Sequence, residues 1–491
     1  QTMIEKMSAK VARFEIPLLL LKKWIPNSFF LDRFPNKNRI VKGLSIDSRA
    51  VEKNFIYLSI KGKTYDGHLF LKEVKKNKAI AAIVEKNKIN KELLEMIDHD
   101  FFLLSVDNVI EAFGKLAERV RKAWEGKLIT VTGSNGKTTA KEIISAILKI
   151  EVGAKSQFSS YGNQNNHIGV PLNLMRLNVQ NKFAVIEMGM NQMGEIKKLS
   201  SMAQPNFSLI VNAHREHQEF LGSIRATAEE NGSVISHLIE NNIVIFPKDK
   251  KNEDVWWKLA NKNKSAVFRF SMFDDESEFA DMDDVKEVTC KILGNNPLFI
   301  ELALNGDSIG RVQLNGLGEH FARTVTGAVA TSIALGLSHE SILQGLKTFT
   351  PIKGRGLFHH LRNGAVVVDD SYNANPDSVH AAITTMANIT GRKAMVLGDM
   401  AEIGENSESI HREILVLALE HLDEVFLIGK YFSMASKSLK QGKSYSSEKK
   451  LEEDVRSWLN LTSSQKSSSL LWIKGSRASN LDLIVNCLVS P

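Results

Sequence analysis

Cysteine is scarce in this sequence: only Cys290 and Cys487 occur among 491 residues. Two thiols so far apart exclude a disulfide framework and a cysteine-based metal site, and they favour a reducing, cytoplasmic compartment. Long hydrophobic runs are also missing. The apolar stretch at residues 16–21 is much too short to cross a bilayer, and Lys22 and Lys23 follow it at once. No secretion signal is recognisable, so we expect neither export nor membrane insertion.

Charge of one sign is not strongly in excess. The chain carries 63 Lys and Arg against 56 Asp and Glu, a formal net charge of +7. No basic stripe interleaved with aromatic residues is visible, so we expect no nucleic-acid partner. A solvated lysine-rich surface explains the small excess, which would also suit a substrate with phosphates and carboxylates. A hydrophobic content of 43% is typical of globular proteins, and the length suggests about three domains.

The texture of the sequence changes twice and predicts an α/β protein with three domains. Residues 1–106 combine short strands and turns and end in an apolar stretch at residues 101–106. Residues 107–350 repeat strand, loop and helix, and residues 351–491 contain a second such series. This alternation favours mostly parallel sheets that helices cover on both faces.

Individual elements follow from hydrophobic runs and their periodicity. Apolar residues spaced as on one helical face predict a helix at residues 137–150, and an alanine-rich segment predicts another at 326–336. Serine- and lysine-rich runs at residues 436–450 and 462–469 predict exposed loops. The predicted buried strands are residues 127–132, 183–188, 207–212, 242–246, 298–304, 365–370, 394–398, 425–429 and 470–474.

A glycine loop joins the first strand and helix of the second domain, with the sequence Thr-Gly-Ser-Asn-Gly-Lys-Thr-Thr from residue 132. Glycines let backbone N–H groups turn towards phosphate oxygens at the positive end of a helix. Lys137 can reach the β- and γ-phosphates of ATP, and the Thr138 hydroxyl can bind magnesium. Val131 replaces the first glycine of the longer motif, and a plain strand-to-helix turn is the alternative. The predicted ATP ligands are Gly133, Ser134, Asn135, Gly136, Lys137, Thr138 and Thr139.

This shortened loop and several other segments resemble those of the Mur ligases, which share a superfamily with the folylpolyglutamate synthases. The resemblance extends from about residue 40 to Arg477, and the segments occur in the order found in the Mur ligases that add D-alanyl-D-alanine. They are Ile-Asp-Ser-Arg at 46–49, Asp-Gly-His at 66–68, Asn-Gln-Asn-Asn-His-Ile-Gly-Val-Pro at 163–171, Ile-Glu-Met-Gly-Met-Asn at 186–191, Asp-Asp-Ser-Tyr-Asn-Ala-Asn-Pro at 369–376, and Leu-Gly-Asp-Met-Ala-Glu-Ile-Gly at 397–404 with His411 following.

The resemblance implies a small α/β UDP-binding domain, a central P-loop domain with a mostly parallel sheet, and a C-terminal Rossmann-like domain. It further implies a monomeric, cytoplasmic ligase that uses ATP and Mg²⁺ to join D-alanyl-D-alanine to a UDP-N-acetylmuramoyl-tripeptide, the last cytoplasmic amide-forming step of peptidoglycan precursor synthesis. ATP would phosphorylate the terminal carboxyl group of the tripeptide. The dipeptide amine would then attack the acyl phosphate.

The same resemblance assigns catalytic and metal-binding roles outside the glycine loop. Glu187 ends a predicted strand, where ligands collect at the edge of a parallel sheet. With Thr138 and His217 it is expected to bind magnesium, the alternatives being a helix-capping carboxylate and a surface histidine. The expected catalytic residues are Lys137, Glu187 and His217, and Arg355 and Asp370 are expected at the ATP site.

Substrate contacts are expected in all three domains. Ser48 and Arg49 are candidates for uridine diphosphate, because a guanidinium group matches phosphate geometry, and a structural turn at residues 47–49 is the alternative. We expect contacts with the muramoyl peptide from Asn165, Asn166 and His167, and the alternative is a polar turn. We expect the nucleotide and dipeptide side of the site to be lined by Tyr372, Asn373 and Asn375. The alternative is an Asx-rich turn that serves only the backbone.

The sequence departs from the pattern of the Mur ligases at several positions. Asn231 stands where these enzymes carry a lysine whose carbamate bridges a second magnesium. Either Glu229 or, as we favour, Glu230 supplies the missing charge, or the second metal is held more loosely. Phe321 lies in a changed adenine-side motif and is a candidate for stacking on adenine. Residues 214–215 are His-Arg where Gly-Pro is usual.

Other functions stay open at this point. A tripeptide-forming Mur ligase or a folylpolyglutamate synthase would have the same loop, but residues 369–376 argue against both. A P-loop motor or switch would need a basic track or switch loops, which we do not find. A catalytically weak UDP-sugar-binding relative is the third alternative, because of the departures at Asn231 and Phe321.

Overall fold

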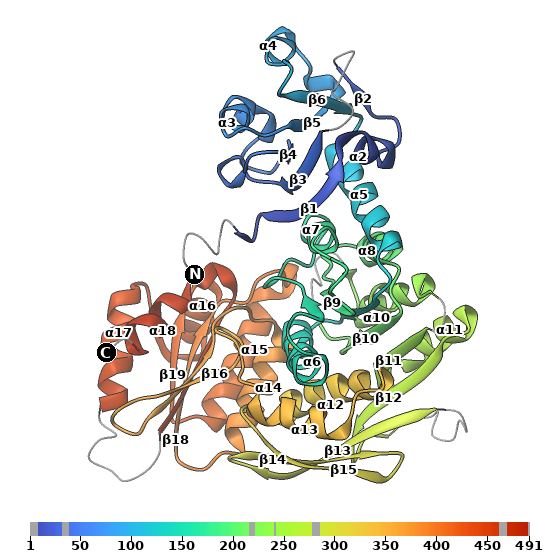
Figure 1. Cartoon of the computed structure of the whole chain (residues 1–491). Coiled ribbons are helices and arrows are strands. Elements are labelled where there is room, and N and C mark those ends of the chain that lie inside the picture. The colour runs from blue at the N-terminus through green and yellow to red at the C-terminus, as the bar shows by residue number, and fades with distance from the viewer. Residues whose placement is uncertain are drawn as a thin grey trace.

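Within the residues that the computed structural model describes, three β-sheets of six, nine and six strands follow one another along the chain. Figure 1 shows the N-terminal domain above the other two, with the central and C-terminal domains side by side beneath it. In the described part of the chain, no helix combines the length and apolar character needed to cross a membrane. The described residues are 8–31, 39–215, 221–239, 242–276, 285–460 and 469–489.

The N-terminal sheet has the strand order β1-β3-β4-β5-β6-β2. Strands β3 to β6 are parallel, and β1 and β2 are antiparallel edge strands. Alternate residues of β4 enter different cores, Ile56 on the face of α2 and Tyr57 on the face of α3, so both faces are covered. The elements are β1 (Val11–Pro17), α2 (Leu18–Trp24), β2 (Phe29–Phe30), β3 (Ile40–Ser45), β4 (Phe55–Leu58), α3 (Leu71–Lys76), β5 (Ala81–Glu85), α4 (Lys91–Glu95) and β6 (Phe102–Val106).

The central sheet has the order β15-β14-β13-β12-β11-β10-β7-β9-β8. Its strands β7 to β13 are all parallel, and β14 and β15 extend it as an antiparallel meander. The strands are β7 (Lys127–Thr132), β8 (Gln157–Ser159), β9 (Phe183–Glu187), β10 (Phe207–Ile210), β11 (Ile243–Pro247), β12 (Ala266–Met272), β13 (Lys286–Asn295), β14 (Leu298–Leu304) and β15 (Asp307–Leu314).

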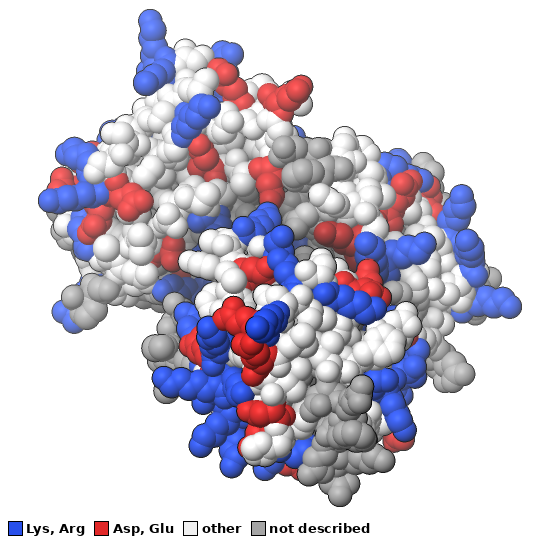
Figure 2. Space-filling model, turned by 90° about the horizontal axis from the view of Figure 1, so that it is seen from above, with Lys and Arg blue, Asp and Glu red and all other residues white. Residues whose placement is uncertain are grey.

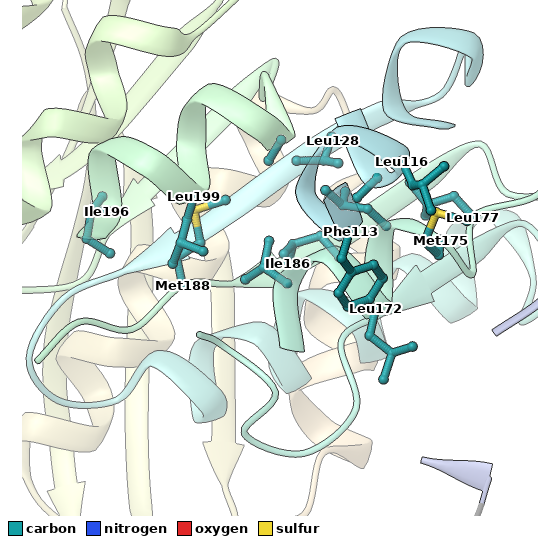
Figure 3. Close-up of a cluster of buried hydrophobic side chains, with 14 of the residues drawn as sticks. Phe113, Leu116, Leu128, Leu172, Met175, Leu177, Ile186, Met188, Ile196 and Leu199 are labelled. Atoms are coloured by element: carbon teal, nitrogen blue, oxygen red, sulfur yellow. The ribbon is translucent and has the colours of Figure 1, made fainter. Parts of the chain in front are cut away.

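Helices cover both faces of the central sheet. Neighbouring strand residues point to opposite sides, so each face presents apolar side chains on which helices pack. Leu128 and Ile186 join α5, α7 and α8 in one core, while Ile129 and Val185 join α6, α12 and α13 in another. Figure 3 shows the first core, with Phe113 of α5 beside Leu172 of α7. The helices are α5 (Val109–Ala123), α6 (Lys137–Val152), α7 (Gly169–Leu174), α8 (Glu195–Ala203), α10 (Ile224–Gly232), α11 (Glu253–Asn263), α12 (Glu319–Ala334) and α13 (His339–Thr348).

The C-terminal sheet has the order β16-β17-β21-β18-β19-β20, with only β16 antiparallel among its described strands. Helices α14 to α16 pack on one face, and α17 and α18 pack on the other. Its elements are β16 (Leu357–His360), β17 (Val366–Asp370), α14 (Pro376–Ala387), β18 (Arg392–Gly398), α15 (Ser407–His421), β19 (Glu424–Ile428), α16 (Lys430–Leu439), β20 (Lys443–Tyr445), α17 (Glu448–Asn460), β21 (Ser469–Lys474) and α18 (Leu481–Val489).

The predicted buried strands are confirmed, two of them (127–132 and 298–304) with the same bounds. The predicted exposed loop at residues 436–450 is wrong, since it contains the end of α16, β20 and the start of α17. Its lysines and its other serines are exposed, while Ser436 and Tyr445 are buried. The other predicted loop, 462–469, lies outside the described residues except for Ser469, which begins β21. The alanine-rich helix α12 starts seven residues before its predicted start at 326.

The surface charges are mixed. On the face seen in Figure 2, Lys and Arg side chains are interspersed with Asp and Glu over all parts of the molecule in view. Some charged residues form ion pairs within one helix, such as Lys122 with Glu118 and Arg456 with Glu452. The small positive net charge is therefore spread out on this face.

Candidate active site

A cleft of about 840 Å³ lies between the central and C-terminal domains. Its walls come from the carboxyl ends of β7, β9 and β10, from the start of α12, and from the loop between β17 and α14. The sequence-predicted residues that line it are Ser134, Asn135, Gly136, Lys137, Thr139, Asn165, Asn166, Glu187, Arg355, Asp370, Tyr372 and Asn373. The structure thus brings together residues from distant parts of the chain at one strand-end edge, where α/β proteins bind ligands.

The glycine loop has its shape fixed by a neighbouring side chain. Asn212, after β10, accepts hydrogen bonds through Oδ1 from the backbone N–H groups of Ser134 (3.1 Å) and Asn135 (2.9 Å). Gly136 has a φ of 79°, and a Cβ atom there would lie 2.7 Å from Thr324 Oγ1. Only glycine fits both the left-handed backbone and this close approach. The Lys137 ammonium group folds back onto the loop and donates to the carbonyl oxygens of Gly133 and Ser134.

Glu187, at the end of β9, is a buried carboxylate with neutral partners. Thr138 donates from Oγ1 to its Oε2 at 2.8 Å, and Asn165 donates from Nδ2 to its Oε1 at 2.8 Å. The residue is 1% exposed, and among the described residues it forms no ion pair within 4 Å. Because a buried charge without a counter-charge is costly, this carboxylate and hydroxyl are suited to an oxygen-preferring cation.

His217, the third expected metal ligand, lies outside the described residues. Across the parts of the chain that the structure describes, no three His, Cys, Asp or Glu side chains gather in a way that could hold a metal ion. A cation at this position would therefore rely on few protein ligands. Mg²⁺ commonly binds in this manner, keeping several waters and taking further oxygens from phosphates.

The C-terminal wall of the cleft contains a charged pair. Lys474, at the end of β21, donates from Nζ to Asp370 Oδ2 at 2.7 Å and to the carbonyl oxygen of Asn373 at 3.1 Å. The Trp472 indole also donates to Asp370. Nearby, the guanidinium of Arg355 lies 4.1 Å from the centre of the Tyr372 ring. The positively charged side chains of Lys474 and Arg355 are thus held on the C-terminal side of the cleft, opposite the glycine loop.

Comparison with known proteins gives the family of this chain. Three family models match it: "Mur ligase family, catalytic domain" at residues 40–121, "Mur ligase middle domain" at 131–332, and "Mur ligase, glutamate ligase domain" at 354–477. A relative from Buchnera aphidicola subsp. Baizongia pistaciae, named UDP-N-acetylmuramoyl-tripeptide--D-alanyl-D-alanine ligase, is 30% identical over 450 residues, which cover 91% of this chain and 92% of the relative. The chain belongs to the Mur ligase family.

Two further comparisons agree with this Mur ligase assignment. A relative of the same name from Escherichia coli K12 is 30% identical and covers 91% of this chain and 93% of its own length. A crystal structure of MurF from Acinetobacter baumannii is similar with a TM-score of 0.83 and 27% identity, covering 97% of this chain and 99% of that one. The three-domain α/β fold expected from the sequence is confirmed.

Asn231 of this Mur ligase supports the glycine loop. Its Oδ1 accepts a hydrogen bond from the Gly133 backbone N–H at 2.9 Å, and the residue is 1% exposed. The prediction that Glu230 supplies metal-site charge is wrong. Its two carboxylate oxygens accept from the backbone N–H groups of Gly194 and Ile196, both at 2.8 Å, and so cap the N-terminus of α8. Adjacent helical positions point in different directions, which separates Glu230 from the loop that Asn231 contacts.

The loop at residues 163–171 has more than one role in this Mur ligase. Asn165 reaches Glu187, whereas Asn166 accepts through Oδ1 from the N–H groups of Ile168 and Gly169 and so caps the following turn. Of the three residues predicted to contact the muramoyl peptide, Asn165 and Asn166 line the cleft. His167 is exposed and is not among its lining residues.

Phe321 and His320, from the motif that departs from the Mur ligase pattern, both have aromatic neighbours. Phe321 lines the cleft and stacks on Phe349, with ring centres 6.4 Å apart and planes at 23°. His320, also in the lining, lies 6.4 Å from the Trp472 ring. Phe321 therefore presents an aromatic surface to the cleft that is already supported from behind.

The N-terminal candidates lie away from this cleft. Asp47 accepts from the Arg49 backbone N–H and from its guanidinium at 2.9 and 2.7 Å, so the structural turn considered as an alternative does form. The Arg49 side chain is 74% exposed, and Ser48 is buried. Neither residue lines the cleft. The Arg49 guanidinium is paired with Asp47 but remains accessible from solvent.

Several motif residues have structural roles. His411 is fully buried; its Nδ1 donates to the carbonyl oxygen of Ser407 and its Nε2 accepts from the Met400 backbone N–H. Asp399 accepts from the first backbone N–H groups of α16. In the N-terminal domain, burial alone would raise the pKa of Asp66, but hydrogen bonds from Lys88 and His68 hold that pKa below its usual range. These side chains thus stabilise the local structure of their own domains.

Sequence reasoning missed Asn212, whose amide orders the glycine loop, and Asp377, which lies in the cleft wall. Asn212 ends the predicted strand at residues 207–212, and its strand-end position is the signal that could have identified it. Asn375, which was predicted, caps α14 through Ser378 and donates from Nδ2 to Asn135 Oδ1 at 2.8 Å. It thus contacts the glycine loop directly.

Proposed function

We propose that this chain is the ATP-dependent ligase that joins D-alanyl-D-alanine to UDP-N-acetylmuramoyl-tripeptide. The observation that carries the proposal is the 30% identity, over nine-tenths of both chains, to relatives of that name. The cleft supports it, because a glycine loop forms one wall and a set of cationic and amide side chains forms the other. The volume between them is about 840 Å³. The reaction needs both, since a carboxylate is a poor electrophile until it is phosphorylated.

The proposed reaction has two steps. An oxygen of the tripeptide carboxylate attacks the γ-phosphorus of ATP, the bond to the β,γ-bridging oxygen breaks, and ADP leaves. The dipeptide amine then attacks the acyl carbon, the carbon–oxygen bond to phosphate breaks, and the amine loses a proton as the amide forms. Both steps concentrate negative charge, which fixed cations stabilise. Lys137 fills this role on the glycine loop, and Arg355 does so from the C-terminal wall.

We assign Mg²⁺ to Thr138 and Glu187, with His217 as a further candidate. The donor set fits, because the Thr138 hydroxyl and the Glu187 carboxylate are oxygen ligands that lie 2.8 Å apart, and Glu187 forms no ion pair with a described residue. When bound, the ion would neutralise phosphate charge. Asn165 would hold the carboxylate in place from its other oxygen.

The remaining contacts are divided among the domains. Ser48 and Arg49 would bind uridine diphosphate, while Asn165, Asn166 and His167 would contact the muramoyl peptide. Tyr372, Asn373 and Asn375 would face the dipeptide, and Asp370 would contact the nucleotide. Domain bounds of 1–106, 107–350 and 351–491 fit this division. A monomeric, cytoplasmic enzyme fits the substrates, which are ATP, a nucleotide-linked precursor and a dipeptide.

Phosphate release from ATP tests the proposal. The purified protein would be given UDP-N-acetylmuramoyl-tripeptides ending in lysine or in diaminopimelate, each with and without D-alanyl-D-alanine. We expect release that depends on both the tripeptide and the dipeptide, with a new amide product seen by mass spectrometry. Release that depends on glutamate and a folate, or on a dipeptide precursor with a third amino acid, would instead identify another member of the superfamily.

A further inference from the structure

The first turn of α14 contacts the central domain through two side chains. Asn375 pairs with Asn135 of the glycine loop, as described above. Two residues further on, the carboxylate of Asp377 accepts two hydrogen bonds from Arg215 and forms an ion pair with its guanidinium group. The hydrogen bonds come from its backbone N–H (2.6 Å to Oδ2) and its Nε (2.8 Å to Oδ1), and the ion-pair contact joins its Nη2 to Oδ1 at 2.8 Å. Figure 1 shows α14 on the side of the C-terminal domain that faces α12.

Arg215 belongs to the short segment that also orders the glycine loop. Asn212 holds the N–H groups of Ser134 and Asn135, and the His214 backbone N–H donates to Ser134 Oγ at 3.0 Å. The His214 ring also contacts the Asn135 amide. A continuous set of hydrogen bonds therefore runs from the glycine loop through residues 212–215 to Asp377.

The position of Asp377 gives this connection a chemical consequence. Helix α14 begins directly after the loop that carries Tyr372 and Asn373, and that loop forms the cleft wall opposite Lys137. Fixing the first turn of α14 therefore fixes the distance between the two walls. The side chains of Arg215 and Asp377 are 31% and 24% exposed. The pair is therefore partly shielded from solvent and is held by two hydrogen bonds, one of them from the backbone, unlike an ordinary surface ion pair.

We propose that Arg215 and Asp377 are positioning residues, which hold the C-terminal wall of the cleft at the correct distance from the glycine loop. This inference rests on the proposed ligase function. Neither residue is assigned a contact with the reacting atoms. Instead, the pair makes the arrangement with both walls in place the favoured one, so that the acyl phosphate formed at the loop meets the dipeptide amine bound at the opposite wall.

A double-mutant cycle with R215A and D377A tests this inference. Residues that act only through each other show strong non-additivity, so we expect each single variant to lower kcat/KM for the dipeptide about tenfold, and the double variant to lower it by no more than either one. The Kd of an ATP analogue is expected to change less, because its phosphates lie on the central domain. R215K, which keeps the charge, is expected to restore part of the loss.

R225A is the matched control, because Arg225 pairs with Asp254 through two guanidinium contacts of 2.5 and 2.6 Å entirely within the central domain. It is expected to leave kcat/KM unchanged. Thermal unfolding of every variant separates a positioning effect from loss of fold, and D377N replaces D377A if the latter unfolds. Independent, multiplicative losses from R215A and D377A would overturn the proposal, as would an R225A loss equal to that of R215A.

A second measurement does not depend on turnover. Cys487 is an exposed cysteine on α18, Cys290 is buried, and Lys262 is exposed at the end of α11. Dyes on Cys487 and on K262C would report the distance between the C-terminal and central domains. We expect R215A to broaden the distance distribution and R225A to leave it unchanged. An unchanged distribution in R215A would overturn the positioning role even if the ligase assay succeeds, whereas failure of the ligase assay alone would reject the proposed function.

Discussion

Glu187 and Glu230 are two buried carboxylates of the central domain, 1% and 3% exposed, that differ in what satisfies them. Glu230 accepts from two backbone N–H groups at the start of α8, where the helix dipole favours a negative charge. Glu187 accepts only from the side chains of Thr138 and Asn165 among its described partners. A backbone donor cannot leave, whereas a side-chain donor can rotate away. The comparison separates a carboxylate built into the fold from one available to a cation.

The largest effect is expected at the glycine loop beside Glu187. In K137A the cation nearest the loop is lost, so the charge that develops on the transferred phosphoryl group is less stabilised. We expect the rate of phosphate release to fall at least about a hundredfold, while circular dichroism and the unfolding temperature stay close to those of the unchanged protein. A rate near that of the unchanged protein would remove the loop from the ATP site.

The next prediction concerns Glu187 itself. In E187Q a neutral amide replaces the carboxylate, which weakens binding of a divalent cation that prefers charged oxygen ligands. The magnesium concentration for half-maximal phosphate release should rise about tenfold or more. The free energy of unfolding should change little or even increase, because a buried charge without a cationic partner is removed. Magnesium titrations and urea unfolding measure the two effects, and a large loss of stability with an unchanged magnesium requirement would make Glu187 a structural residue like Glu230.

E230Q should show the reverse pattern. The amide keeps one acceptor oxygen, so one backbone N–H of α8 is left without its partner. We expect a loss of about 1–2 kcal/mol in the free energy of unfolding and no change in the magnesium requirement. E229Q is the control: Glu229 is 55% exposed and lies 3.9 Å from Arg225, so its loss should alter stability by less than about 0.5 kcal/mol. A raised magnesium requirement in E230Q alone would erase the distinction between the two carboxylates.

The smallest expected effect is none. Asn231 has an amide in place of an amine and cannot take up carbon dioxide, and its oxygen is engaged by the Gly133 N–H. Removing bicarbonate and carbon dioxide from the assay should therefore leave phosphate release unchanged. Recovery of a depleted enzyme on addition of bicarbonate would instead show that another lysine carries a carbamate.

The sequence predicted features that depend on local patterns. The strand and helix around the glycine loop, β7 and α6, follow from an apolar run, two glycines and a 3.6-residue repeat. The region around β20 and α17 was mistaken for a loop. There the buried face of α17 is reduced to four residues, Leu451, Val455, Trp458 and Leu459, and the helix is otherwise highly polar.

Side-chain partners across domains could not be predicted in the same way. The spacing of residues 212–215 places them after a strand, but nothing in the sequence indicates that Arg215 meets Asp377, more than 160 positions away. Likewise, Glu230 and Asn231 are neighbours in the sequence, yet one caps α8 and the other supports the glycine loop. The direction of a side chain within a helix and the orientation of two domains both arise from the packing of the whole chain.

The junction between the N-terminal and central domains has a different kind of consequence. Arg176 donates to the carbonyl oxygens of Ala9 and Val11, and Gln164 donates to that of Ala9. Burial lowers the pKa of Arg176 to about 10, which still leaves it charged at neutral pH. On the N-terminal side, these bonds involve main-chain atoms alone, which every amino acid supplies. The side chain of Ala9, which is only partly buried, can therefore change during evolution without loss of the attachment, whereas that of Val11 is also fixed by the core of the N-terminal domain.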